Sequence, residues 1–231
     1  MEEPEFIGRT RWSYDAAADD VAVWIRGELG ERPVDRALLD GFAEVVRGQG
    51  PVADLGCGSG RVTAHLARLG VDVFGVDLSG GMVAAARRTY PGLRFATGSM
   101  LGLDIADGAL GGVVAWFSVI HVPDERLPGV FGEFRRVLRP GGYALVAFQV
   151  GDGVEHRSRA GAHDVALDFH YRDPDAVAGL LERAGLAVRA RTVRAPVTSG
   201  DYPEDTPQAF LLARREDTSR TRVSGGSRPR S

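Results

Sequence analysis

The chain has 231 residues and a formal net charge of −3, which fits one large domain or two small ones and provides no strong field for nucleic acid or an anionic membrane. No apolar segment is long enough to span a bilayer, and the acidic start "MEEPEFIGRT" is unlike a signal peptide. All 28 basic residues are arginine, which excludes lysine chemistry, and the single cysteine, Cys57, excludes an intramolecular disulfide. We therefore expect a cytoplasmic protein.

Apolar periodicity predicts helices and strands that alternate along most of the chain. The expected helices cover about 15–28, 34–48, 60–70, 78–90, 125–138 and 174–185. The expected strands cover 51–57, 71–77, about 93–97, 111–119, 143–150, 186–195 and 207–214. Strands separated by helices of this length predict an α/β fold with a mostly parallel sheet covered on both faces.

Two segments lack a clear period. Residues 151–172, "GDGVEHRSRAGAHDVALDFHYR", follow the end of a strand, where open α/β sheets place ligand-binding loops, so we expect an irregular loop there. The last stretch, "EDTSRTRVSGGSRPRS", is polar and rich in Gly, Ser and Arg, so we expect residues 215–231 to be disordered.

Three glycines, Gly56, Gly58 and Gly60, lie between the first strand and the helix that follows it, where a ligand can approach the backbone closely. The dinucleotide fingerprint G-x-G-x-x-G requires a further glycine, and this chain has Arg61 there. This spacing disfavours NAD and FAD.

Two acids flank the turn. Asp54, two residues before the first glycine, suits a cationic ligand better than a pyrophosphate. Asp77 ends the second strand, the place of acids that accept hydrogen bonds from ribose hydroxyls. A ribose without phosphates, joined to a cationic centre, describes S-adenosylmethionine (SAM).

The segments "VADLGCGSG", "VFGVDLS", "GSM", "AWFSVIHVPDERL" and "RRVLRPGGYALVAF" resemble, in this order, the class I SAM-dependent methyltransferases, in particular the small-molecule enzymes of methyltransferase type 11. The resemblance covers roughly residues 10–214. It implies a Rossmann-like, seven-stranded, mostly parallel sheet with an antiparallel last strand, helices on both faces and an N-terminal helical lid. The lid would comprise residues 1–48 and the SAM-binding domain residues 49–214, with 151–172 as the substrate loop.

The resemblance also implies roles for individual residues around the cofactor, with S-adenosylhomocysteine (SAH) as the product. Gly56, Cys57 and Gly58 would line the methionine part, and Asp54 would orient the turn and the amino group. Asp77 would hold both ribose hydroxyls. The adenine and its surroundings would involve Leu78, Met82, Ser99, Met100 and Phe117. Family members often carry Asp in the "GSM" segment, where this chain has Ser99.

The segment after the fourth strand indicates the substrate class. It lacks the N/D-P-P-Y/F motif of nucleic-acid amino-methyltransferases, the acids of metal-dependent catechol enzymes and the Pro-Cys of cytosine-C5 enzymes. The similarity to small-molecule enzymes of bacterial secondary metabolism remains. Within it, His121 is a candidate general base, with a structural role as its alternative. Tyr14 resembles the lid tyrosine of related enzymes, and its alternative role is to anchor that helix.

Gln149, His170, Tyr171 and Arg172 are candidates to line the acceptor pocket, or else part of a solvated loop. His156, His163, Asp164 and His170 lack the spacing of metal ligands, so we expect no metal site. The expected partner is a small molecule, without nucleic acid or membrane.

Two other hypotheses remain open: a SAM-binding protein that catalyses a cyclisation or rearrangement without methyl transfer, and a non-catalytic partner subunit. The sequence leaves open the acceptor, the methylated atom and the oligomeric state.

Overall fold

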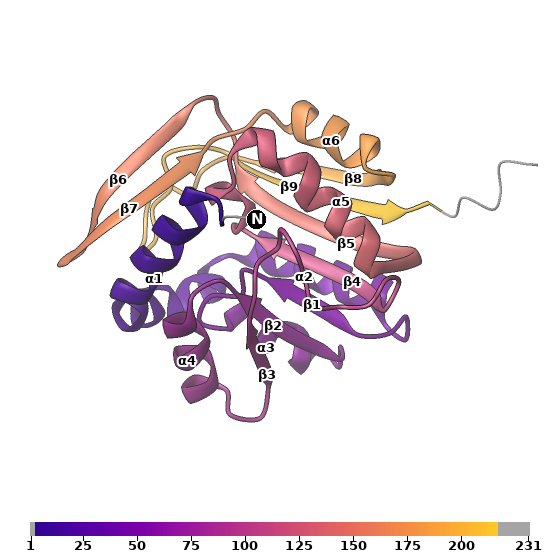
Figure 1. Ribbon diagram of the computed structural model, residues 1–231, viewed down its shortest axis with the longest axis horizontal. Helices are drawn as coiled ribbons and strands as arrows, with labels where there is room; N and C mark the ends of the chain where they lie inside the picture. Colours follow the sequence, from indigo (N-terminus) through magenta and orange to yellow (C-terminus); the bar gives the residue numbers. More distant parts are fainter. Residues whose placement is uncertain (1–2, 217–231) are drawn as a thin grey trace, which may run out of the picture.

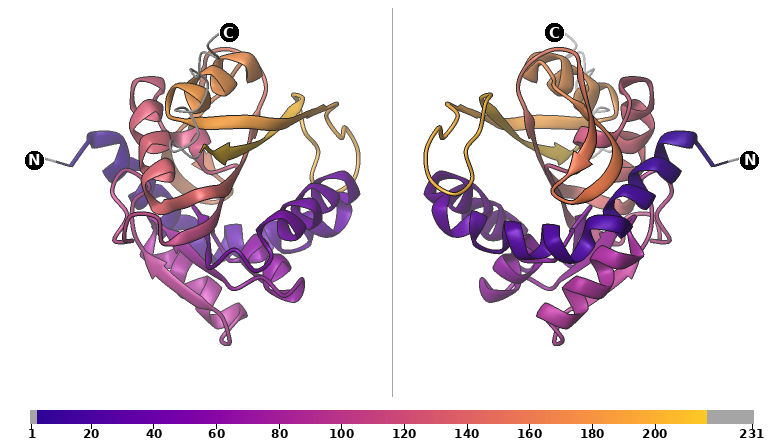
Figure 2. Two further views of the ribbon diagram at one scale, coloured as in Figure 1. Left: turned by 90° about the vertical axis from the view of Figure 1, so that its right-hand side faces the viewer. Right: turned by 90° about the vertical axis from the view of Figure 1, so that its left-hand side faces the viewer.

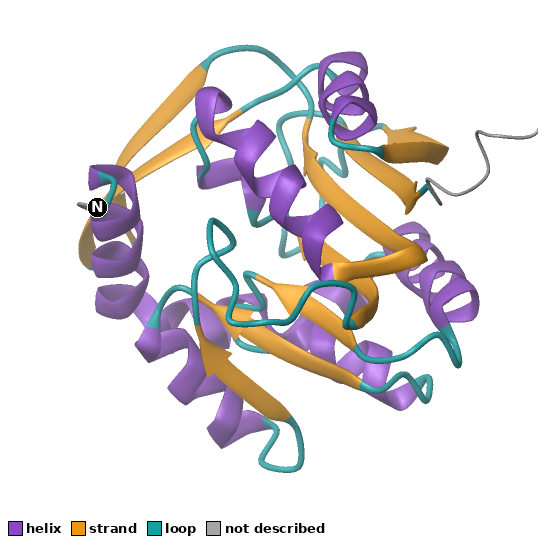
Figure 3. Ribbon diagram, turned by 45° about the vertical axis from the view of Figure 1, so that its right-hand side comes forward, coloured by secondary structure: helices purple, strands orange, loops and turns teal. Residues whose placement is uncertain are grey.

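The computed structural model describes residues 3–216, so nearly all of the segment expected to be disordered lies outside the described residues. The chain forms a seven-stranded sheet with helices on both sides (Figures 1 and 3) and a separate two-stranded hairpin. The strands are β1 Val52–Leu55, β2 Val73–Asp77, β3 Arg94–Thr97, β4 Leu110–Trp116, β5 Leu138–Gln149, β6 Val154–Ala160, β7 His163–His170, β8 Leu186–Arg194 and β9 Gln208–Arg215. The α-helices are α1 Glu5–Trp24, α2 Pro33–Val46, α3 Arg61–Arg68, α4 Gly80–Thr89, α5 Leu127–Val137 and α6 Pro174–Arg183.

The strands of the large sheet have the order β3-β2-β1-β4-β5-β9-β8. The neighbours from β3 to β5 are parallel, whereas β9 is antiparallel to both β5 and β8. The expected fold class, including the antiparallel last strand, is therefore confirmed. In this topology the carboxyl ends of β1, β2, β4 and β5 meet at one edge, where open α/β sheets bind ligands.

Buried side chains on both faces of the sheet fix the helices. Helices α5 and α6 pack on one face through Phe131, Phe134 and Leu181, and helices α2 and α3 pack on the other through Phe42 and Leu66. This explains the nearly continuous apolar runs of the central strands, which are covered on both sides. None of the helices in the described part of the chain has the length and apolarity needed to cross a membrane.

Residues 151–172 do not form the irregular loop that we expected. Most of them form the antiparallel hairpin of β6 and β7, which projects from the sheet and lies beside α1 (Figures 1 and 2). Val165 and Leu167 alternate inward on β7, but the whole of β6 is exposed or partly exposed. A strand without an apolar face leaves no period of two in the sequence, which is why the hairpin was missed.

The first helix also differs from the prediction. It begins at Glu5 rather than near residue 15 and ends at Trp24, and residues Ile25–Glu31 continue as a 3-10 helix. Its buried face consists mainly of Ile7, Ser13 and three alanines, so its apolar periodicity is weak. The short 3-10 helices Val119–His121 and Asp124–Arg126 follow β4.

Candidate active site

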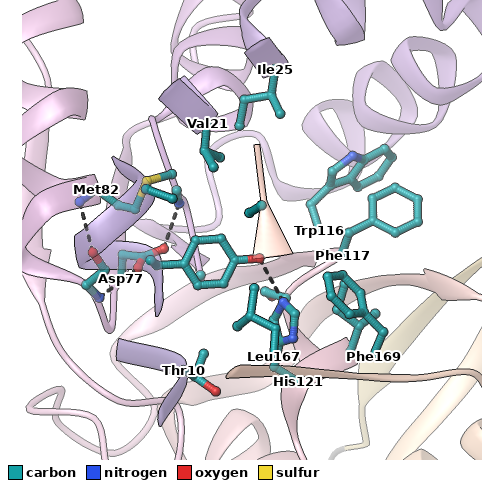
Figure 4. A pocket seen from close by; sticks show the side chains of 18 of the residues that line it. Thr10, Val21, Ile25, Asp77, Met82, Trp116, Phe117, His121, Leu167 and Phe169 are labelled. Carbon is teal, nitrogen blue, oxygen red and sulfur yellow. Dashed lines mark hydrogen bonds between the residues drawn. The ribbon is translucent and has the colours of Figure 1, made fainter. Parts of the chain in front are cut away.

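A cavity of about 860 Å³ lies at the carboxyl ends of the parallel strands, between α1, the β6–β7 hairpin and the loop before β9. Figure 4 shows Asp77 and Met82 on one side of this cavity and Trp116, Phe117 and Phe169 on the other. Most residues selected from the sequence line it: Tyr14, Gly56, Gly58, Asp77, Leu78, Met82, Ser99, Met100, Phe117, His121, Gln149 and Tyr171. The other four, Asp54, Cys57, His170 and Arg172, are not among its lining residues.

The turn after β1 depends on a glycine at position 56. Gly56 has a φ of 73°, which side chains rarely tolerate, and a Cβ there would overlap the side chain of Ser118. The Gly56 and Cys57 amides both donate to the carbonyl of Val76, at 2.7 and 3.1 Å. The turn is thereby held against the end of β2, and it lines the cavity with backbone instead of side chains.

Asp77 joins this turn to the next helix. Its Oδ2 accepts from the Gly58 amide at 2.7 Å, and its Oδ1 accepts from the Ser79 amide at 2.9 Å. Burial raises the pKa of this carboxyl group, and the two amide hydrogen bonds oppose that rise. Ser79 in turn caps α4 by accepting from the Met82 amide at 3.0 Å. The sequence-predicted acid is thus fixed in orientation at the edge of the cavity.

Asp54 has a different place from Asp77. It is buried behind the turn, where its Oδ2 accepts from the Thr63 hydroxyl of α3 at 2.6 Å and its Oδ1 has no partner. Burial raises its pKa to about 6. Asp54 therefore holds α3 to β1 and is not part of the cavity wall.

Cys57 also points away from the cavity. Its side chain packs with Val83, Ala86 and Phe95, and burial raises the pKa of the thiol. The buried, protonated thiol fills space between α4 and the sheet. We expected Cys57 to contact the cofactor. With its side chain in this orientation, it could do so only through its backbone.

Phe117 is strained where it lines the cavity. It is the one residue other than glycine with a positive φ in the described chain, at 52°. The strand β4 therefore ends at Trp116, earlier than predicted, and the Phe117 amide donates to Ala147 of β5 at 3.0 Å. Such strain costs on the order of 1 kcal/mol and often occurs at functional sites.

Tyr14 and His121, selected separately from the sequence, form a buried pair. The Tyr14 hydroxyl lies 2.8 Å from Nε2 of His121, and the dashed line to His121 in Figure 4 marks this bond. His121 Nδ1 lies 2.9 Å from the backbone carbonyl of Asp168, and the ring stacks edge-on against Phe169. The structure thus brings the N-terminal helix α1 and the candidate base into direct contact.

The contacts of His121 determine its tautomer. Burial lowers the pKa of His121 to about 4, so the imidazole is neutral near pH 7. A carbonyl oxygen only accepts, so Nδ1 must carry the hydrogen that is donated to Asp168. Nε2 then has a free lone pair and accepts from the Tyr14 hydroxyl, whose own pKa is raised by burial.

Three consecutive residues of α1 connect it to three walls of the cavity. Ser13 Oγ accepts from the Ala166 amide of β7 at 2.8 Å, and Tyr14 binds His121. Asp15 Oδ1 accepts from the Ser79 hydroxyl at 2.5 Å and the Gly81 amide at 2.9 Å, at the amino end of α4. The residues of α1 that line the cavity lie along one side of the helix: Phe6, Ile7, Thr10, Tyr14, Ala17, Asp20, Val21 and Trp24.

Arg172 lies beside the site and is not part of the cavity wall. It is buried, its Nε donates to Asp124 at 2.8 Å, and its Nη atoms donate to the carbonyls of Val119 and Val122. These bonds hold the 3-10 turn that contains His121, so Arg172 positions the turn. His170 is buried too, with its Nε2 unpartnered outside the cavity.

The sequence did not reveal Trp116, Leu167 and Phe169, which line the cavity. Trp116 was visible only as part of an apolar strand. The sequence signal for the β7 side of the cavity was the alternation of Val165, Leu167 and Phe169, which comprises only three apolar positions. No group of three His, Cys, Asp or Glu side chains within residues 3–216 is arranged to hold a metal.

The comparison with protein families agrees with this geometry. Residues 52–142 match a family model described as a methyltransferase domain. This segment of the chain therefore belongs to a methyltransferase domain family, in agreement with the resemblance to class I SAM-dependent methyltransferases. The matched segment includes the glycine turn, Asp77 and His121.

Two named relatives illustrate the similarity of this chain to methyltransferases. It is 41% identical to a demethylmenaquinone methyltransferase of Beutenbergia cavernae over 121 residues, which are 52% of this chain and 42% of the relative. It is 28% identical to a malonyl-[acyl-carrier protein] O-methyltransferase of Pectobacterium atrosepticum over 67% of this chain and 55% of the relative. The chain therefore spans only about half the length of these relatives.

Solved structures share the fold of this chain over most of its length. A complex of DhpI with SAH has a TM-score of 0.71 at 20% identity and covers 93% of this chain and 99% of DhpI. A 1,6-didemethyltoxoflavin-N1-methyltransferase of Burkholderia thailandensis has a TM-score of 0.63 at 18% identity and covers 94% of each chain. The N-terminal helix and the strands after β5 are therefore within the shared region.

Proposed function

We propose that this chain binds SAM at the Asp77 side of the cavity and transfers its methyl group to a small organic acceptor at the His121 side. One observation carries the proposal: a single cavity joins the glycine turn and Asp77 to the Tyr14–His121 pair. Helix α1, which we propose as the lid, covers the same space, so both ligands would be enclosed together.

The residues on the Asp77 side fit the proposed cofactor. Each carboxylate oxygen of Asp77 accepts one backbone N–H, and a carboxylate offers about four acceptor positions, so positions remain for two ribose hydroxyls. Gly58 leaves the approach free of side chains, and Met82 and Met100 supply apolar wall for a base. Donors from a ligand would also stabilise the buried negative charge of Asp77.

Methyl transfer from a sulfonium is an in-line displacement, and bound SAM would supply the electrophilic methyl group. The contribution of this chain is to hold the acceptor, exclude water and remove a proton. Positioning of reactants is worth about 7 to 11 kcal/mol in favourable intramolecular models. Enclosure by α1 and the hairpin would serve this positioning and keep water out.

The Tyr14–His121 pair suggests how the proton leaves. The Tyr14 hydroxyl donates to His121, so its oxygen has lone pairs available for an acceptor O–H or N–H. The acceptor proton would pass to Tyr14 as the tyrosine proton passes to Nε2 of His121. The lowered pKa makes His121 a weak base, so the transfer suits an acceptor that becomes strongly acidic as it gains the methyl group.

The named relatives support a small or carrier-bound organic acceptor. They are described as acting on demethylmenaquinone, a malonyl-carrier protein and a didemethyltoxoflavin. We further propose a cytoplasmic location, for which the single buried cysteine is the support.

Calorimetry with Asp77 variants tests the cofactor site. We expect Asp77→Ala to weaken SAM and SAH binding by about 3 kcal/mol, roughly 100-fold, because two charge-assisted hydrogen bonds to the ribose would be lost. The control is Asp72→Ala. Asp72 lies in the loop before β2 and forms an exposed ion pair with Arg94, so this variant should bind SAM and SAH normally. Equal affinities for wild type and Asp77→Ala, with thermal unfolding showing both folded, would contradict the proposal.

A further inference from the structure

Two side chains on the acceptor side of the cavity have buried polar atoms without partners. They are the indole Nε1 of Trp116, a donor, and the amide Oε1 of Gln149, an acceptor. Trp116 is only 3% exposed. Unsatisfied buried polar atoms are costly, and a ligand in the cavity can complete the hydrogen bonds of those that face it. Arg32 Nε is a third such atom, but carboxylates of Glu28 and Glu204 lie 3.7 and 3.6 Å from it.

The sheet register places both side chains on one face. Trp116 of β4 pairs with Ala147 of β5, so these two residues point the same way, and Gln149 is two residues further along β5. From strand spacing and rise, the Cα atoms of Trp116 and Gln149 are about 8 Å apart. A ligand the size of a bicyclic ring can therefore reach both groups.

Aromatic rings pack against Trp116. Phe117 stands edge-on to Trp116, with ring centroids 5.7 Å apart. Figure 4 shows Phe169 on the same side, opposite Asp77. Rings held in this way favour a flat aromatic guest, which they can contact by stacking or edge-on.

The positive charges on the cavity wall already have acidic partners. Each of the four arginines that line it is paired: Arg32 with Glu28 and Glu204, Arg61 with Glu28, Arg157 with Glu155, and Arg159 with Asp164. An anionic acceptor would have to break one of these pairs to find a partner. Five acidic side chains also line the wall, Asp20, Glu28, Asp77, Glu204 and Asp205, so the wall disfavours an anionic acceptor.

We propose that Trp116 and Gln149 are the specificity-determining residues for the acceptor, which is an uncharged aromatic ring system. One hydrogen-bond acceptor of this ligand receives the Trp116 N–H, and one O–H or N–H donates to Gln149 Oε1. This assignment rests on the proposed function of the same cavity, because it requires that the cofactor occupies the Asp77 side.

Nitrogen NMR on the full chain saturated with SAH tests the assignment. The indole N–H groups of Trp12, Trp24 and Trp116 give three signals, and Trp116→Phe identifies one of them. The probes are 2-quinolone, which has a carbonyl and an N–H, quinoline, which lacks the donor, and the anion 2-naphthoate. We expect 2-quinolone to bind and to shift the Trp116 signal, quinoline to bind roughly tenfold more weakly, and 2-naphthoate to remain unbound.

Substitutions test the contributions of Trp116 and Gln149 separately. Trp116→Phe and Gln149→Leu should each weaken 2-quinolone binding roughly tenfold, whereas Gln149→Leu should leave quinoline binding unchanged. Trp12→Phe makes the same change at a half-exposed position outside the cavity and should match wild type. Thermal unfolding checks that Trp116→Phe is folded, and Gln149→Leu tests the proposal without altering the packed indole.

Each contrary result has its own meaning. If SAH does not bind the wild-type chain, the proposed function fails and the acceptor site fails with it. If SAH binds but 2-quinolone does not, or if its affinity is equal in wild type and both variants, only the acceptor site is overturned. A Trp116 signal shifted by SAH alone, with SAH binding weakened in Trp116→Phe, would assign the indole to the cofactor and also overturn it.

Discussion

Two aspartates that the sequence placed on either side of one turn have separate environments. Asp77 faces the cavity and is held by two backbone amides, whereas Asp54 lies behind the turn with one hydroxyl partner. Sequence motifs locate both residues, because their spacing from the glycines is fixed by the strand–turn–helix connection. The motifs do not reveal which carboxylate reaches the ligand, because that depends on side-chain direction.

The glycine turn can be tested with a matched pair of substitutions. Gly56→Ala should destabilise the fold by about 3 kcal/mol or more, because the new methyl group overlaps Ser118 in a backbone conformation that disfavours side chains. Gly58, with a φ of 54°, shares the unfavourable backbone conformation, but Gly58→Ala should cost only about 1 kcal/mol because its Cβ would lie 3.3 Å from the flexible methyl end of Met82. Urea unfolding measures both, and equal losses would contradict this account of the turn.

Burial of His121 predicts a pH-dependent stability. Its pKa is about 4 in the folded chain and about 6.5 when exposed, so unfolding takes up a proton between these values. The free energy of unfolding should fall as the pH decreases from 6.5 to 4, by roughly 3 kcal/mol in total, and be unaffected by this group above pH 6.5.

His121→Asn provides the comparison, since its side-chain amide can still donate to the Asp168 carbonyl. Urea unfolding of both proteins at pH 7.5 and 4.5 isolates the histidine, because other titrating groups contribute equally to both. Parallel losses of stability would show that His121 is not buried as a neutral ring.

At the scale of elements, the sheet and its helices were predictable but the two covering segments were less so. The alternating strands and helices carry strong apolar patterns because the sheet buries both faces. Helix α1 and the β6–β7 hairpin bury only small or few side chains, such as Ala17, Ala18 and Val165. Their starting points and conformations therefore depend on contacts with the rest of the fold, which no local pattern records.

The contact between α1 and α4 predicts a role for Asp15 in ligand retention. Asp15→Ala removes two hydrogen bonds at the amino end of α4, so α1 should open more readily and SAH should dissociate roughly tenfold faster. Stopped-flow displacement of SAH measures this rate. Asp19 also lies on α1 and forms only an exposed ion pair with Arg88 of α4. Asp19→Ala should therefore leave the rate near that of wild type. An equal effect of both variants would argue against a specific latch at Asp15.

At the scale of the whole molecule, the chain combines a segment that matches a family model with covering elements outside that match. The segment that matches the methyltransferase family ends at residue 142, while the acceptor side of the cavity includes Gln149, Leu167 and Phe169 beyond it. The cofactor side could therefore be predicted from shared motifs. On the acceptor side the sequence named Gln149 and Tyr171, which line the cavity, but missed Leu167 and Phe169, which belong to a hairpin without a strong local pattern.

The central claim is that the cavity accepts an adenosyl ligand with a ribose and a positive centre. Native mass spectra of the full chain with SAM, SAH and NAD in turn test it most directly. We predict a one-to-one complex with SAM and with SAH and none with NAD. Binding of NAD, or of none of the three, would contradict the account and leave the fold without its proposed cofactor.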